Sequence, residues 1–130
     1  MKKNLLLISL ALLTTVAHAD WTRVEQTSSE LTLYVDHDSR KDTGYGSTLM
    51  WYLLDYAALQ DYQGKPFHSV KGQDEYDCTK GVRRDLLHFW HQDGMGNSRM
   101  MQAEYTPGPW IAPAEGSVHQ VLLQIACAKK

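Results

Sequence analysis

The architecture of this chain follows from one apolar run, Ser47-Thr48-Leu49-Met50-Trp51-Tyr52-Leu53-Leu54-Asp55-Tyr56. Side chains of an extended strand alternate between its two faces, and this run is apolar on both. One face carries Leu49, Trp51 and Leu53, and the other carries Met50, Tyr52 and Leu54. A strand with two apolar faces needs cover on both, so we expect it in the interior of a sheet.

Two shorter strands are expected before this run, at Trp21–Gln26 and Leu31–Asp36. The second alternates cleanly and points its leucines and its valine inward. We expect a polar connection at His37–Gly46 and a polar break, punctuated by glycine and proline, at Gln60–Pro66.

Three more strand patterns follow the break, at Phe67–Tyr76, Val82–Gln92 and Arg99–Tyr105. Two glycines within Asp93–Asn97 predict a hairpin turn between the last two of these strands. We therefore expect six strands before the chain changes its pattern.

The last segment has a helical period. Apolar residues recur from Val118 to Ile125 at the i, i+3, i+4 and i+7 positions of an amphipathic helix. Ser117, with Gln120 three residues later, is typical of a capping box. The expected fold is α+β, a six-stranded antiparallel sheet with a C-terminal amphipathic helix packed on one face.

Residues 1–19 have the composition of a secretory signal. Lys2 and Lys3 precede an apolar run, and Ala17-His18-Ala19 fits a cleavage site. The run, Leu5–Val16, is shorter than the roughly 20 residues that a membrane-spanning helix needs. We expect an exported protein, periplasmic or secreted, with residues 1–19 as its signal and 20–130 as one domain.

The charge argues against one class of partner, and the cysteine content predicts a covalent link. The formal net charge is −2, and nucleic-acid binding needs a basic stripe, so we expect no nucleic-acid partner. Cys78 and Cys127 are the only two cysteines, and in an exported protein they predict one disulfide. The alternatives are a reactive thiol or a zinc site, and the wide spacing without a clustered histidine pair argues against zinc.

The order of several short motifs resembles that of the surface-adhesin protein E family. The resemblance extends over nearly all of the mature chain and rests on Trp21, Tyr34-Val35-Asp36, Trp51 with Asp55-Tyr56, Tyr76-Asp77-Cys78, Trp110 and Ser117–Cys127. It implies a twisted antiparallel sheet, a helix packed on it, one disulfide, and adhesion to host matrix or serum proteins. The sequence departs from the family's lipoprotein member because it has no cysteine at the cleavage site.

Two histidines, His88 and His91, are the most suggestive candidates for a ligand site. Residues three apart on a strand point to opposite faces, so the two imidazoles cannot easily share one metal. A site that includes His68 or His119 would depend on the tertiary structure. We expect no metal and no cofactor. The alternative function is a periplasmic small-ligand or haem-binding protein, which requires His88 or His91 to line an apolar pocket.

We expect the charged clusters to be solvated. Asp74, Glu75 and Asp77 are assigned to an exposed strand end, because nothing beside them suggests a cleft that would shift the pKa of a carboxyl group. Lys80–Arg84 is assigned to a turn and the start of a strand. No residue is a candidate nucleophile, so we expect a protein that is not an enzyme.

Aromatic residues in or beside loops are the remaining candidates for recognition. The candidate binding surface consists of Tyr45, Tyr62 and Trp110, together with Arg83 and Arg84, because aromatic and arginine side chains carry much of the binding energy of interfaces. The resulting hypothesis is an exported, non-enzymatic binding domain whose partners are extracellular or host proteins.

Overall fold

The structure, a computed structural model, describes residues 19–24 and 29–129. Residues 1–18, which hold nearly all of the predicted signal, lie outside the described residues, as does the end of the first expected strand. None of the helices in the described ranges is long and apolar enough to cross a membrane.

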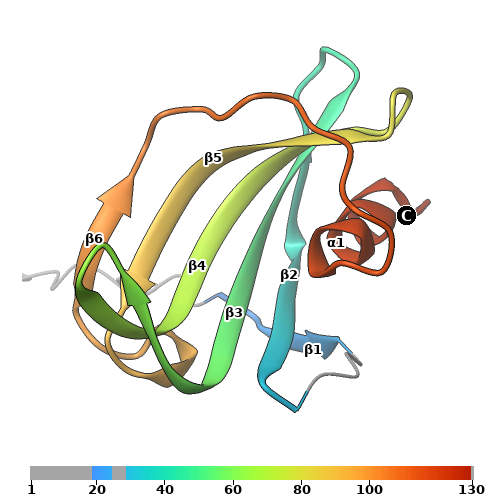
Figure 1. Ribbon diagram of the computed structural model, residues 1–130. Coiled ribbons are helices and arrows are strands. Elements are labelled where there is room, and N and C mark those ends of the chain that lie inside the picture. The colour runs from blue at the N-terminus through green and yellow to red at the C-terminus, as the bar shows by residue number, and fades with distance from the viewer. Residues whose placement is uncertain (1–18, 25–28, 130) are drawn as a thin grey trace, which may run out of the picture.

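Six strands form one antiparallel meander, in which each strand pairs with its neighbour in sequence (Figure 1). They are β1 Thr22–Val24, β2 Leu31–Asp42, β3 Ser47–Tyr62, β4 Lys65–Asp77, β5 Val82–His91 and β6 Met100–Glu104. A 3-10 turn, η1 (Gly94–Gly96), joins β5 to β6, and the helix α1 spans Val118–Cys127. The predicted fold class is confirmed.

Two expected connections are largely strand. β3 continues to Tyr62 and turns at Gln63 and Gly64, whose φ angles of 51° and 79° suit the two-residue hairpin turn that matches strand twist. β2 likewise runs to Asp42, although we expected a connection there. Both hairpin ends are mostly exposed and no apolar alternation marks them, so pairing through the ladder hydrogen bonds extends the strands.

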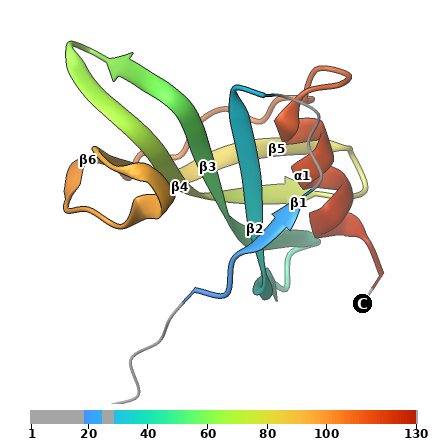
Figure 2. The ribbon, with the colours of Figure 1, turned by 90° about the horizontal axis from the view of Figure 1, so that it is seen from below.

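The helix covers one face of the sheet, the helix-facing side. Leu122 is fully buried there, in a core with Met50, Tyr52 and Leu54 of β3. Figure 2 shows α1 on the side of the molecule away from β6. The opposite side of the sheet, the outer face, carries Trp51, which is only partly buried.

Both ends of α1 are held. Ser117 Oγ accepts the N–H of Gln120 at 3.2 Å, and the Gln120 side chain in turn accepts the N–H of Gly116 at 2.7 Å. The disulfide Cys78–Cys127, with Cα atoms 5.6 Å apart, joins the last turn of α1 to the chain just after β4. The predicted helix cap and the predicted disulfide are therefore present.

Candidate functional site

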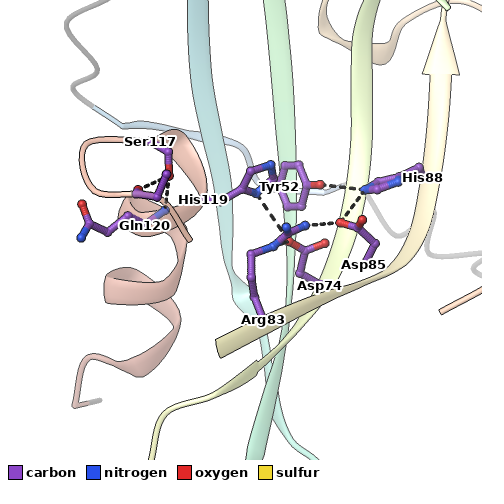
Figure 3. A network of polar contacts seen from close by, with 9 residues as sticks. Tyr52, Asp74, Arg83, Asp85, His88, Ser117, His119 and Gln120 are labelled. Atoms are coloured by element: carbon purple, nitrogen blue, oxygen red, sulfur yellow. Dashed lines mark hydrogen bonds and ion pairs between the residues drawn. The ribbon is translucent and has the colours of Figure 1, made fainter. Parts of the chain in front are cut away.

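A polar cluster lies between the sheet and the helix on the helix-facing side (Figure 3). Its side chains come from four elements, and we call them the helix-facing polar cluster: Tyr52 of β3, Asp74 of β4, Arg83, Asp85 and His88 of β5, and His119 of α1.

Register places Tyr52 in this cluster. Tyr52 is paired with Gly72 on β4, and Gly72 is paired with His88 on β5. A Cβ on Gly72 would collide with the Tyr52 ring, so the glycine lets the ring lie across β4. The Tyr52 hydroxyl then comes within 3.0 Å of His88 Nε2.

A buried ion pair forms the centre of the cluster. Arg83 Nε donates to Asp74 Oδ2 at 2.8 Å, and Arg83 Nη2 contacts Asp85 Oδ1. Asp74 is fully buried and Arg83 is 4% exposed, so the expectation that both are solvated is wrong. The physical reason is alternation, because Asp74 shares the helix-facing side with Val70 and Tyr76, which belong to the core.

The environment shifts several pKa values in the cluster. Burial raises the pKa of Asp74 to about 6, against the opposing effect of Arg83. The hydrogen bond with His88 lowers the pKa of Asp85 to about 2. Burial lowers the pKa of His119 to about 4, so this imidazole is neutral at pH 7. The expectation that nothing beside Asp74 shifts its pKa is therefore wrong.

The cluster is better suited to holding the fold together than to binding a cation. Asp74, Asp85 and His88 offer ligand atoms within 4.8 Å of one another, a spacing that could suit a metal ion. The Arg83 guanidinium already contacts both carboxylates, however, and its charge would repel a cation placed there. A cleft of about 230 Å³ is lined by all members of the cluster except Asp74, together with aromatic and apolar side chains of β3, β4 and β5.

Trp110 lies in an exposed patch at one end of the sheet. It is 41% exposed, and the Arg84 guanidinium stacks 4.6 Å from the centre of its ring. Ile111, 45% exposed, follows it and pairs through its backbone with Arg83. Trp110 also lines a hollow of about 300 Å³ with Lys80. We call Lys80, Arg84, Trp110 and Ile111 the Trp110 patch.

The five residues of the candidate binding surface do not form one surface. Tyr45 is 94% exposed at the β2–β3 turn, which lies at the same end of the sheet as the β4–β5 turn because Ser47 pairs with Asp77. Tyr62 lies at the other end, where its ring stacks on Trp90 at 4.4 Å. Arg83 is buried, so Tyr45, Trp110 and the partly exposed Arg84 remain at one end of the sheet.

The two candidate histidines point to opposite faces, as the spacing predicts. His88 belongs to the helix-facing polar cluster, while His91 lines a second cavity on the outer face. This outer pocket, of about 320 Å³, is lined by Ala19, Trp21, Trp51, Lys71, Phe89, His91 and Met100. Alternation alone groups Phe89 with His91. Alternation could not show that Trp21, which precedes the edge strand β1, also lines the pocket.

The fold agrees with known proteins. A family model described as surface-adhesin protein E matches residues 21–128. Among solved structures, that of Haemophilus influenzae protein E is similar, with a TM-score of 0.60 and 13% sequence identity over 88% of this chain and 87% of that chain. At this identity the likeness concerns the fold. No curated protein sequence matches the chain.

Proposed function

The chain belongs to the surface-adhesin protein E family, and we propose that it is an exported, non-enzymatic domain that binds host or other extracellular proteins. Surface adhesins are exported, which agrees with the disulfide Cys78–Cys127, since such bonds persist in oxidising compartments. Residues 1–19 are the cleaved signal in this proposal, and residues 20–130 are the binding domain.

The observation that carries the proposal is the Arg84–Trp110 pair. Tryptophan and arginine dominate the binding energy of protein interfaces, and here the exposed Trp110 stacks on the partly exposed Arg84. Arg84 is also held by Glu75 at 2.7 Å, so its side chain is ordered before a partner arrives. Ordering in advance reduces the entropy lost on binding. Tyr45, at the same end of the sheet, extends the surface available to a partner.

A binding assay on immobilised matrix and serum proteins tests this function. We expect saturable binding that weakens at least about tenfold in Trp110→Ala, while the free energy of unfolding stays unchanged. Tyr105→Ala is the matched control, because Tyr105 is 63% exposed and lies outside the Trp110 patch. Equal binding by the wild type and Trp110→Ala would remove the patch from the proposal. If none of these proteins binds saturably, the proposed binding function is overturned.

Mass spectrometry of the native protein tests the export proposal separately. We expect Asp20 as the first residue, without a lipid, because the cleavage site has no cysteine. A chain that keeps Met1, or a lipid-modified first residue, would contradict this processing.

A further inference from the structure

We propose that the cleft on the helix-facing side binds a neutral sugar, as a single pyranose ring with free neighbouring hydroxyl groups. This helix-facing cleft is the cavity of about 230 Å³ that most of the helix-facing polar cluster lines. It is separate from the Trp110 patch, so the inference does not depend on the proposed protein binding.

Strand register places a polar row of side chains next to an apolar row in the cleft. The polar row runs across β3, β4 and β5 and consists of Tyr52, Gly72 and His88. The apolar row lies two residues away in each of these strands and consists of Leu54, Val70 and Trp90. Two residues of an extended strand span roughly 7 Å, so one six-membered ring with its substituents can contact both rows.

Aromatic rings extend the apolar row. Tyr56 and Phe67 line the cleft in edge-to-face contact, with ring centres 5.8 Å apart. Tyr62 stacks on one face of the Trp90 ring, and Trp90 also lines the cleft. The faces of a pyranose ring carry C–H groups, and such apolar surface packs well on aromatic side chains. Aromatic walls suit other ligands too, so the polar groups decide the class.

The polar groups of the cleft carry both signs of charge. Asp85, whose side chain is 39% exposed, is ionised because its hydrogen bond with His88 lowers its pKa to about 2. Its carboxylate can only accept hydrogen bonds, whereas the Arg83 guanidinium can only donate them. A cation in the cleft would be repelled by Arg83 and an anion by Asp85. Each hydroxyl group of a sugar both donates and accepts, so neighbouring hydroxyls satisfy both side chains without a charge.

The polar atoms that a sugar requires are free and accessible. Three nitrogens make no hydrogen bond among residues 19–24 and 29–129: Arg83 Nη1, His88 Nδ1 and His119 Nε2. The fully covered polar atoms that lack a partner in those ranges include His119 Nδ1 but none of these three. All three residues line the cleft, so these nitrogens are available to the hydroxyl groups of a ligand.

The site is held in place before a ligand arrives. Arg83 Nε donates to Asp74 at 2.8 Å and Arg83 Nη2 contacts Asp85, so the guanidinium is fixed from two sides. The His119 ring of α1 meets the Tyr52 ring edge-on, with centres 6.1 Å apart, so the helix supplies one wall (Figure 3). The volume of about 230 Å³ is below the roughly 300–1,000 Å³ of pockets for larger ligands, which favours one ring.

The test titrates the mature protein, residues 20–130, with the methyl glycosides of glucose, mannose, galactose and N-acetylglucosamine. Two-dimensional NMR of the backbone amides measures the affinity and locates the site. We expect at least one glycoside to bind saturably, with a dissociation constant in the millimolar range, and to shift the amides of Val70, His88 and Trp90. 2-Methoxytetrahydropyran, which keeps the ring and lacks the hydroxyl groups, should bind at least about tenfold more weakly.

Asp85→Ala should weaken binding of the same glycoside at least about tenfold, because it removes the ionised acceptor. Asp38→Ala is the matched control, since Asp38 is exposed and does not line the cleft. If Asp85→Ala does not fold, Tyr56→Leu tests the aromatic wall, and the ligand comparison in the wild type still decides. The proposal is overturned if no glycoside saturates the protein or if 2-methoxytetrahydropyran binds equally well. Saturation by tetramethylammonium chloride alone would also overturn it and assign the cleft to an organic cation.

Discussion

Two ion pairs join β4 to β5 one residue apart and face opposite sides of the sheet. In the pair Asp74–Arg83, on the helix-facing side, the side chains are 0% and 5% exposed. In the pair Glu75–Arg84, on the outer face, they are 12% and 32% exposed. An acidic residue of β4 and an arginine of β5 thus form a buried ion pair on one side and a partly exposed ion pair on the other. The alternation of a strand separates the core from the proposed binding surface within two residues.

The largest effect that this comparison predicts is in the core under the helix. Leu122→Asp places a charge without a partner in a fully buried position, and should cost more than about 4 kcal/mol, enough to unfold the domain. Circular dichroism and urea denaturation measure the loss. Trp110→Ala on the outer face serves as the contrast, with an unchanged denaturation midpoint. A folded Leu122→Asp variant would refute the assignment of the helix-facing side.

The two ion pairs give the sharpest comparison. Arg83→Met leaves Asp74 buried and unpaired, and should cost about 3–5 kcal/mol, whereas Arg84→Met should cost about 1 kcal/mol or less. Urea denaturation of both variants at pH 7 measures the difference. The double variant Asp74→Leu with Arg83→Met should recover much of the loss, since apolar residues can replace a buried pair. A similar loss in the free energy of unfolding for Arg83→Met and Arg84→Met would contradict the distinction between the two faces.

The next effect depends on pH. The pKa of His119 is lowered by burial to about 4, so between pH 6.5 and pH 4 the unfolded chain binds this proton and the folded chain does not. Stability from His119 is therefore lost as the pH falls through that window, by on the order of 2 kcal/mol. The pKa of Asp74, raised to about 6, acts with the opposite sign, and Asp74 Oδ2 lies 3.7 Å from His119 Nδ1.

Comparison of the wild type with His119→Phe measures the contribution of His119 together with its effect on Asp74. The stability of the wild type relative to the variant should decrease between pH 6.5 and pH 4, as measured by urea denaturation at several pH values. A difference that stays constant with pH would show that His119 titrates as it does in an unfolded chain.

The smallest effect concerns the start of the helix. Ser117→Ala removes the acceptor for the Gln120 N–H and should cost about 1 kcal/mol. Ser117→Asp keeps an acceptor and serves as the control in the same denaturation experiment. A loss as large as that of Leu122→Asp would mean that the cap, and not the apolar contact, holds the helix to the sheet.

Much of the fold could be predicted from the sequence because its signals are local. The two apolar faces of β3 and the helical period after Ser117 each depend on residues close together in the chain. The lengths of the strands could not be predicted in the same way. The ends of β2 and β3 are mostly exposed, and pairing with a neighbouring strand extends them without an alternating apolar pattern.

The candidate sites were less predictable because they combine distant segments. Asp74 could have been assigned to the core, since it is two residues from Tyr76 and alternates in phase with it. The prediction that Asp74 belongs to a solvated acidic cluster gave more weight to its charge than to its alternation with Tyr76 along the strand. The outer pocket has Trp21, Trp51 and Phe89 among its lining residues, and no local pattern groups these three residues.

The topology also determines how the parts of the domain are joined. Each strand from β1 to β5 pairs with the strand that follows it, so neighbouring strands are connected by short loops. The helix arrives last in the chain and returns across the sheet to β2, β3 and β4. Cys78 and Cys127 therefore link the chain after β4 to the last turn of a helix that contacts three strands of the sheet. In an oxidising compartment this disulfide restricts the unfolded chain more than the folded one, and so it opposes separation of the helix from the sheet.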